Sequence, residues 1–157
     1  MTKELKARQR GKAHTQEESN KNMGKKILVI NDTQYILEMF RLLLEPEGYE
    51  VLLSALPMQN MKEVERVKPD LIILDIIFGN QKSGWQMLQL LRMYPPTARI
   101  PIIVCSAAVT EVMEQEGFLV SQGIKIVYKP FDVETLFGAI AQTFKMGEAS
   151  IQNKQQS

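Results

Sequence analysis

One apolar run carries a single carboxylate, and it limits the folds that this chain can adopt. Residues 71–78 read LIILDIIF, directly after Pro69-Asp70 and before Gly79. Continuous apolarity of this length predicts a strand that is buried on both faces, as in a parallel sheet covered by helices. A buried ionised carboxylate is costly unless another group pairs with it. Asp75 therefore either ends the strand towards a helix cap or solvent, or belongs to a binding site at the strand end.

Length and composition allow one domain. The chain has 157 residues, of which 45% are apolar, which is enough for one core with little left for a second. Its single cysteine, Cys105, lies in an apolar run, which indicates a buried thiol in a reducing compartment and excludes a disulfide framework. No segment has the length and apolarity to cross a bilayer or to direct secretion, so we expect a cytoplasmic protein.

The N-terminal residues are polar and basic. Residues 1–26 hold eight Lys and Arg against three Glu, whereas the whole chain has a formal net charge of +1, so the remainder is mildly acidic. Residues 1–24 lack aromatic side chains and a sustained apolar period, which predicts a disordered tail that does not bind nucleic acid. A start of translation at Met23, directly before the first strand, remains open. The only histidine, His14, lies in this tail, so the domain has no histidine for phosphotransfer or metal binding.

Between residues 25 and 145, apolar strands alternate with helical patterns. The predicted strands are residues 27–30, 50–54, 71–78, 101–106 and 124–128. The first helix follows Asp32 and ends at Gly48, and the next three begin near Pro57, at Ser83 and at about Thr110, the last of these covering residues 110–120. Asp132 caps the final helix, and residues 146–157 form a polar C-terminal tail. This alternation predicts an α/β domain with a doubly wound, five-stranded parallel sheet and right-handed crossovers. The second strand is the most polar and suits a sheet edge, which gives the order 2-1-3-4-5.

Polar side chains close four of the predicted strands. They are Asn31 and Asp32 after the first strand, Asp75 after the third, Ser106 after the fourth and Lys129 after the fifth. All of them are expected at the carboxyl edge of the sheet, where open parallel sheets bind ligands. Two carboxylates suit Mg²⁺, and a lysine and a hydroxyl can each bind a phosphoryl oxygen. Asp75, the most enclosed carboxylate, is the candidate nucleophile for an acyl phosphate.

Four segments carry a resemblance to a known family. They are KILVIND at 26–32, PDLIILD at 69–75, IIVCSA at 102–107 and KPF at 129–131. In these segments the sequence resembles the receiver domain of bacterial two-component response regulators, in its single-domain, CheY-like form. The resemblance implies a flavodoxin-like, CheY-like fold over about residues 25–145.

The resemblance also implies a function. A sensor histidine kinase or a phosphotransfer protein would phosphorylate Asp75, with Mg²⁺ bound beside it by Asp32, Asp75 and the backbone carbonyl of Ile77. Ser106 would couple the phosphoryl group to a face made by the fourth helix, fifth strand and fifth helix, which would bind a downstream protein. The resemblance also implies that the Lys129–Pro130 peptide bond is cis, which would aim the Lys129 side chain into the site.

Three departures from the family pattern affect these expectations. The first acidic position is the neutral Asn31, which can still order a metal-bound water, so Mg²⁺ binding is expected to be weaker. The loop after Asp75 lacks the family's usual Met-Pro and is one residue longer. Ile126 stands where many receivers carry an aromatic switch residue, so the usual aromatic relay is expected to be missing.

Other functions remain open. The main alternative is a receiver that acts as a protein-docking module without phosphorylation, which Asn31 and Ile126 favour and Asp75, Ser106 and Lys129 oppose. A haloacid dehalogenase-type phosphatase would need an Asp at the position of Ile77. Dinucleotide binding would need glycines after the first strand, where none occur.

The expected partners are proteins. No segment remains for a helix-turn-helix, so direct DNA binding is not expected, and neither is membrane binding. A homodimer is also open, because the last two helices offer a suitable surface.

Overall fold

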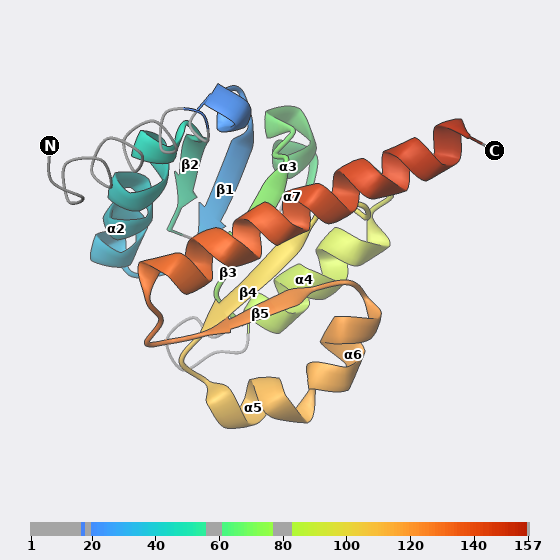
Figure 1. Ribbon diagram of the computed structural model, residues 1–157. Coiled ribbons are helices and arrows are strands. Elements are labelled where there is room, and N and C mark those ends of the chain that lie inside the picture. The colour runs from blue at the N-terminus through green and yellow to red at the C-terminus, as the bar shows by residue number, and fades with distance from the viewer. Residues whose placement is uncertain (1–16, 18–19, 56–60, 77–82, 157) are drawn as a thin grey trace, which may run out of the picture.

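The computed structural model describes residues 17, 20–55, 61–76 and 83–156. Within these residues five strands form one parallel sheet in the order β2-β1-β3-β4-β5 (Figure 1). The strands are β1 (Lys26–Ile30), β2 (Glu50–Ser54), β3 (Leu71–Leu74), β4 (Ile102–Ser106) and β5 (Lys125–Tyr128). The predicted α/β class and strand order are thus confirmed. Most of the predicted basic tail, residues 1–24, lies outside the described residues.

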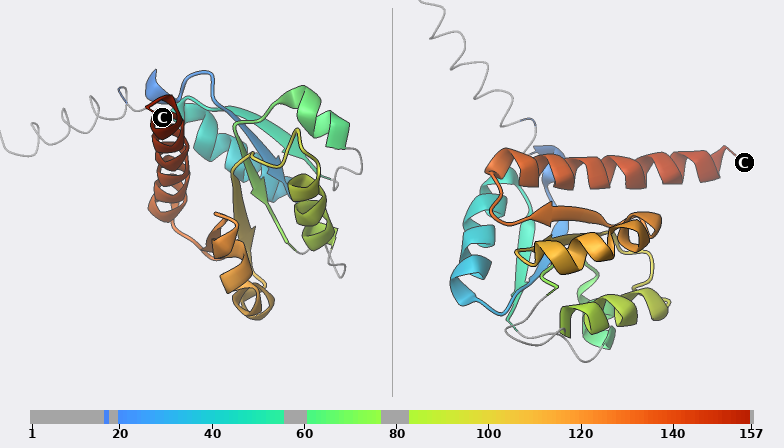
Figure 2. Two further views of the ribbon diagram at one scale, coloured as in Figure 1. Left: turned by 90° about the vertical axis from the view of Figure 1, so that its right-hand side faces the viewer. Right: turned by 90° about the horizontal axis from the view of Figure 1, so that it is seen from below.

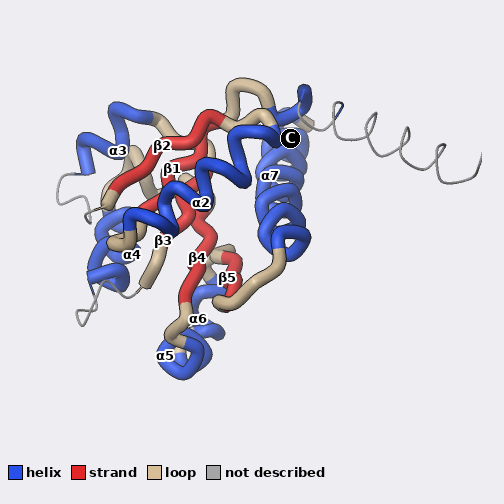
Figure 3. The backbone as a smooth tube through the Cα atoms, turned by 90° about the vertical axis from the view of Figure 1, so that its left-hand side faces the viewer, coloured by secondary structure: helices blue, strands red, loops and turns tan. Residues whose placement is uncertain are grey.

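Helices cover both faces of the sheet. They are α2 (Gln34–Leu44), α3 (Met61–Val67), α4 (Ser83–Met93), α5 (Val109–Glu114), α6 (Glu116–Ser121) and α7 (Val133–Gln155), with a 3-10 turn at Glu45–Glu47. Helices α2 and α7 lie on one face, and α3 to α6 lie on the other (Figures 2 and 3). This two-sided cover is the arrangement that a doubly wound sheet requires.

The strands alternate between two apolar cores. In β3, Ile72 and Leu74 belong to the core under α3 to α6, whereas Leu71 and Ile73 belong to the core under α2 and α7. None of these four side chains is more than 1% exposed. Because both faces are covered, every position of the strand is apolar, which explains the continuous run in the sequence. The polar strand β2 lies at the edge, as expected.

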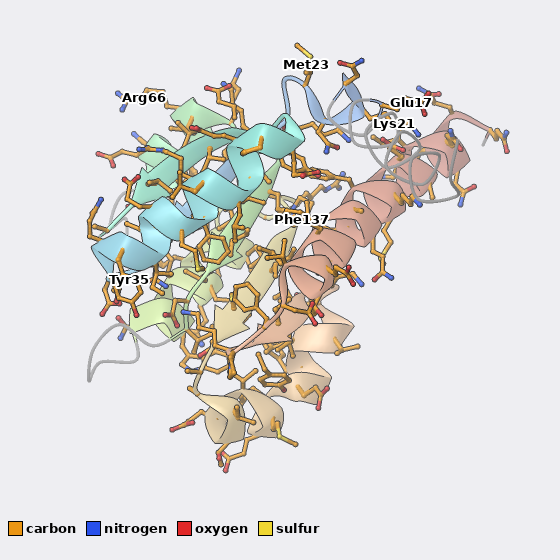
Figure 4. The ribbon with its side chains drawn as sticks, turned by 60° about the vertical axis from the view of Figure 1, so that its left-hand side comes forward. Glu17, Lys21, Met23, Tyr35, Arg66 and Phe137 are labelled. Atoms are coloured by element: carbon orange, nitrogen blue, oxygen red, sulfur yellow. The ribbon has the colours of Figure 1, made fainter. Side chains whose placement is uncertain are left out.

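Apolar side chains of the helices face one of these two cores, and other side chains face solvent. Phe137 of α7 packs against the core under α2 and α7, whereas Tyr35 at the start of α2 and Met23 before β1 point into solvent (Figure 4). Gly48 ends the 3-10 turn with a φ of 97°, a left-handed conformation in which glycine meets no steric cost. No helix in the described part of the chain has the length and apolarity to cross a membrane.

The structure differs from the sequence expectation in two helices. The predicted helix at residues 110–120 is broken at Gln115 into α5 and α6, since Gln115 has a non-helical ψ of 3°. The last helix, expected to end near Lys145, continues to Gln155, although every residue from 145 to 155 is exposed. A helix that is already docked can extend without further burial, because each added residue gains a backbone hydrogen bond.

Asp132 caps α7, as predicted, by accepting a hydrogen bond of 2.7 Å from the backbone N–H of Thr135. This contact holds the pKa of Asp132 below its ordinary value. The cap's contribution is therefore fully present above the unfolded-state pKa of about 4, and it is lost as the pH falls through the lower folded-state pKa.

We accordingly expect Asp132→Ala to lower the free energy of unfolding at neutral pH, with a difference from wild type that shrinks in acid. Chemical denaturation between about pH 2 and pH 7 measures this difference. Asp132→Asn is the control, because its amide caps the helix at every pH. A difference between alanine variant and wild type that does not change with pH would contradict the assignment.

Candidate functional site

The carboxyl edge of the sheet gathers the polar residues that the sequence singles out. Asn31 directly follows β1, Asp75 follows β3, Ser106 is the last residue of β4 and Lys129 follows β5. Backbone hydrogen bonds extend the strand pairing to this level: Asp75 N–H donates to Ile30 O at 3.1 Å, and Lys129 N–H donates to Ser106 O at 2.9 Å. The strand pairing therefore places these residues at the same edge before any side-chain contact is considered.

One oxygen of Asp75 receives two donors. Lys129 Nζ lies 3.3 Å from Asp75 Oδ2, and Asn31 Nδ2 donates to the same oxygen at 3.1 Å. The Lys129 and Asp75 side chains are only 20% and 12% exposed, so their attraction is less screened than that of a surface pair. The structure thus brings the predicted acceptor, the predicted lysine and Asn31 together from the ends of three strands.

Asn31 is anchored on its other side by the following turn. Its Oδ1 accepts a hydrogen bond of 2.9 Å from the backbone N–H of Thr33, and the residue is 3% exposed. This is an Asx turn, in which a short polar side chain bonds to the backbone two residues later. The sequence analysis did not identify Thr33, although an Asn that precedes a helix start is a known signal for such a turn.

Asp32 and Ser106 lie at this edge with opposite exposure to solvent. Asp32 is exposed and accepts a hydrogen bond of 3.2 Å from Thr33 Oγ1. Ser106 is 1% exposed, and its Oγ accepts a hydrogen bond of 3.1 Å from the backbone N–H of Ala108. The predicted site therefore combines one exposed and one partly buried carboxylate with a buried hydroxyl.

Several further predictions concern neighbours of the site. Ile77, the expected carbonyl ligand, and most of the loop after Asp75 lie outside the described residues. The Lys129–Pro130 peptide bond is cis, as the family resemblance implies. Ile126 is a strand residue packed in the core under α3 to α6, and Tyr128 packs against the same core. Burial, with a smaller effect of Glu116, raises the pKa of Tyr128.

Gly84 is a positioning residue that the sequence analysis missed. It lies in the first turn of α4, where a Cβ atom would collide with the carbonyl oxygens of Asp75 and Ile76. Only glycine allows α4 to approach the backbone of Asp75 and Ile76 this closely. The neighbouring Trp85 packs against the core under α3 to α6.

The carboxylates at this edge fit Mg²⁺. Among the described residues, no group of three or more His, Cys, Asp or Glu side chains could hold a metal ion. Asp32 and Asp75 offer hard carboxylate oxygens, and Mg²⁺ is commonly bound by one or two carboxylates together with waters and phosphate oxygens. The residues present therefore fit this ion, and they would hold it at the carboxyl edge.

Comparisons with known proteins agree with this geometry. The family of response regulator receiver domains matches residues 27–141. The chain is 33% identical over 107 residues to the transcriptional regulatory protein YvrH of Bacillus subtilis, which covers 68% of this chain and 43% of that protein. It is 27% identical over 125 residues to the chemotaxis protein CheY of Listeria monocytogenes, which covers 76% of this chain and 98% of that protein.

A solved structure shows the same fold. The chemotaxis protein CheY4 of Vibrio cholerae superimposes with a TM-score of 0.64 at 25% identity, covering 76% of this chain and 98% of that one. The chain spans less than half the length of several curated relatives that it matches, and nearly all of CheY.

The contact at Gly84 generates a stability prediction. Gly84→Ala should lower the free energy of unfolding by about 1–3 kcal/mol, because the added methyl group forces α4 away from Asp75 and Ile76. Thermal or urea denaturation measures this loss. Gly138→Ala is the matched control: Gly138 is also helical, and nothing lies within 4 Å of an added Cβ. The control should be neutral or stabilising by up to about 1 kcal/mol, and an equal effect at both positions would contradict the close approach.

The buried thiol beside the site generates a reactivity prediction. Cys105 is 2% exposed, and burial raises the pKa of its thiol to about 12, with Lys129 lowering and Asp75 raising it to smaller extents. At pH 8 the folded protein should react with a thiol reagent on the order of a thousandfold more slowly than the unfolded chain. Absorbance with a disulfide reagent, with and without denaturant, measures the two rates. If Cys105 reacts as fast in the folded protein as in the unfolded chain, its burial would be contradicted.

Proposed function

The chain belongs to the family of response regulator receiver domains of two-component systems, and on that premise we propose that Asp75 accepts a phosphoryl group. Receiver domains are signalling modules rather than classical enzymes, and they interact with histidine kinases and downstream targets. The observation that carries the proposal is the Asp75 carboxylate at the end of a buried strand, 3.3 Å from the Lys129 ammonium. A strand end with only a structural role could carry an uncharged residue here and would not require a lysine beside a carboxylate.

The donor is the phosphohistidine of a sensor kinase or a phosphotransfer protein. An Asp75 carboxylate oxygen forms a bond to phosphorus while the bond from phosphorus to the histidine nitrogen breaks. The electron pair of the broken bond stays on the imidazole, which regains a proton from solvent. Lys129 attracts the negative charge of the phosphoryl oxygens, and the two apolar cores exclude water from the strand side of Asp75.

Receiver domains generally bind Mg²⁺ at the phosphorylation site. In this chain Asp32 and Asp75 would hold the ion, and Ile77 would offer its backbone carbonyl. When bound, the ion supplies positive charge that offsets the repulsion between the carboxylates and the incoming phosphoryl oxygens.

Ser106 is proposed to pass the signal on. Its hydroxyl is a donor as well as an acceptor, so it can turn towards a phosphoryl oxygen while β4 stays in place. The adjacent face, made by α5, α6, β5 and α7, suits a downstream protein. It exposes Phe118 by 52% and Val120 by 62%, and it borders a groove of about 960 Å³ between β5 and α7. These exposed apolar side chains favour the proposal, because protein-binding surfaces present apolar groups to solvent. A second copy of the chain is another proposed occupant of this face.

Intact mass spectrometry tests the acceptor. Incubation of the full chain with acetyl phosphate and Mg²⁺ should add one phosphoryl group to wild type and none to Asp75→Ala. Asp70→Ala is the matched control. Asp70 precedes the same strand at the opposite edge of the sheet and accepts a hydrogen bond from the Lys26 N–H. The Asp70→Ala variant should therefore still gain one phosphoryl group at Asp75. Label on Asp75→Ala, or its absence from wild type, would refute the proposal.

The second candidate function is a docking module that needs no phosphorylation. The observation that favours it is Asn31, a neutral amide bonded to Asp75 where a second acid would strengthen ion binding. In that case wild type stays unlabelled, and Asp75→Ala retains full affinity for its protein partner.

A further inference from the structure

The side-chain amide of Asn31 has one defined orientation. Its Oδ1 receives the Thr33 N–H at 2.9 Å, and its Nδ2 lies 3.1 Å from Asp75 Oδ2. A backbone N–H can only donate and an ionised carboxylate can only accept, so exchanging the two ends would create two repulsive contacts. With 3% of the residue exposed, bulk water cannot replace either partner. The group that faces the acceptor is therefore a donor.

A donor at this position does not suit the outer shell of a metal ion. A metal-bound water directs its hydrogens outwards and needs an acceptor, which a carboxylate would provide and an NH₂ group cannot. The sequence alone suggests a water-mediated place for Asn31 in the Mg²⁺ site, and the observed orientation favours another role.

We infer that Asn31 is a positioning residue that, together with Lys129, holds the Asp75 carboxylate through Oδ2 without a metal ion. The inference rests on the proposed role of Asp75 as the phosphoacceptor. A carboxylate in place of Asn31 would lie about as close to Oδ2 and repel it unless a cation stood between them. The amide instead attracts Oδ2, so the acceptor is already oriented before Mg²⁺ arrives, at the expense of affinity for the ion.

Calorimetric titration of the full chain with Mg²⁺ separates the two roles. If Asn31 competes with the ion for Asp75 Oδ2 instead of ordering its water, Asn31→Ala removes a competitor and no ligand, and it should bind Mg²⁺ no more than about twofold more weakly than wild type. Asn31→Asp adds a negative charge and should bind about tenfold more tightly, which shows that the assay responds to this position. Asn31→Ala binding that is fivefold or more weaker than wild type, or an unchanged affinity in Asn31→Asp, overturns the inference.

A second measurement needs no change at Asn31 and so does not depend on the folding of that variant. In a ¹⁵N-labelled chain without Mg²⁺, Asp75→Ala should shift the side-chain NH₂ resonances of Asn31 and speed their exchange with solvent. Asn22 is the internal control, because its Nδ2 donates to Glu47 O at 2.9 Å on another part of the molecule. Asn31 resonances that change no more than those of Asn22 would overturn the inference.

Acetyl phosphate labelling keeps this inference distinct from the proposed function. Unlabelled wild type refutes Asp75 as the acceptor, whatever the titrations show. Labelled wild type, combined with weakened Mg²⁺ binding in Asn31→Ala, refutes the positioning role alone.

Discussion

A carboxylate at the end of a strand that is buried on both faces is the constraint on which this structure depends. Asp75 follows four residues that are at most 1% exposed, so its charge has little water to stabilise it. Asn31 and Lys129 supply that stabilisation, and each comes from the end of a different strand. Removing either donor would leave a partly buried charge with fewer partners, which costs more than the contact itself contributes.

The sheet topology turns this local requirement into a site. In the order β2-β1-β3-β4-β5, the strand that carries Asp75 has the Asn31 strand on one side and the Ser106 strand on the other. All five strands run in parallel, so their carboxyl ends meet at one edge, and the residues there come from positions spread over about a hundred residues of sequence. The fold thus assembles an acid, an amide, a hydroxyl and an ammonium that no local segment could bring together.

The sequence predicted features that depend on burial or on capping. The cap at Asp132 occurs as predicted, and the strand predicted at 71–78 occurs over Leu71–Leu74, because apolar continuity and side-chain chemistry determine both. Gly48 was predicted to end the first helix, and it instead ends the 3-10 turn that follows α2. The same reasoning located Asp75 and Lys129, because strand ends are visible in the pattern. It could not orient the Asn31 amide, since that depends on the position of Asp75, which lies far away in sequence, and it could not reveal how closely α4 approaches the carbonyl groups of Asp75 and Ile76 at Gly84. The break at Gln115 carries no proline or glycine signal at that residue.

The length of α7 has a geometric consequence. Its buried side chains end at Thr143, and the Lys25–Glu148 pair at 3.7 Å is a contact of the extension with the rest of the domain. The eleven residues from Lys145 to Gln155 extend the helix axis by roughly 16 Å. A rigid rod of that length magnifies small rotations: a tilt of about 5° at the docked end sweeps the tip through roughly 1.4 Å. Sub-ångström adjustments where α7 meets the sheet therefore become displacements at its tip that a neighbouring molecule can sense.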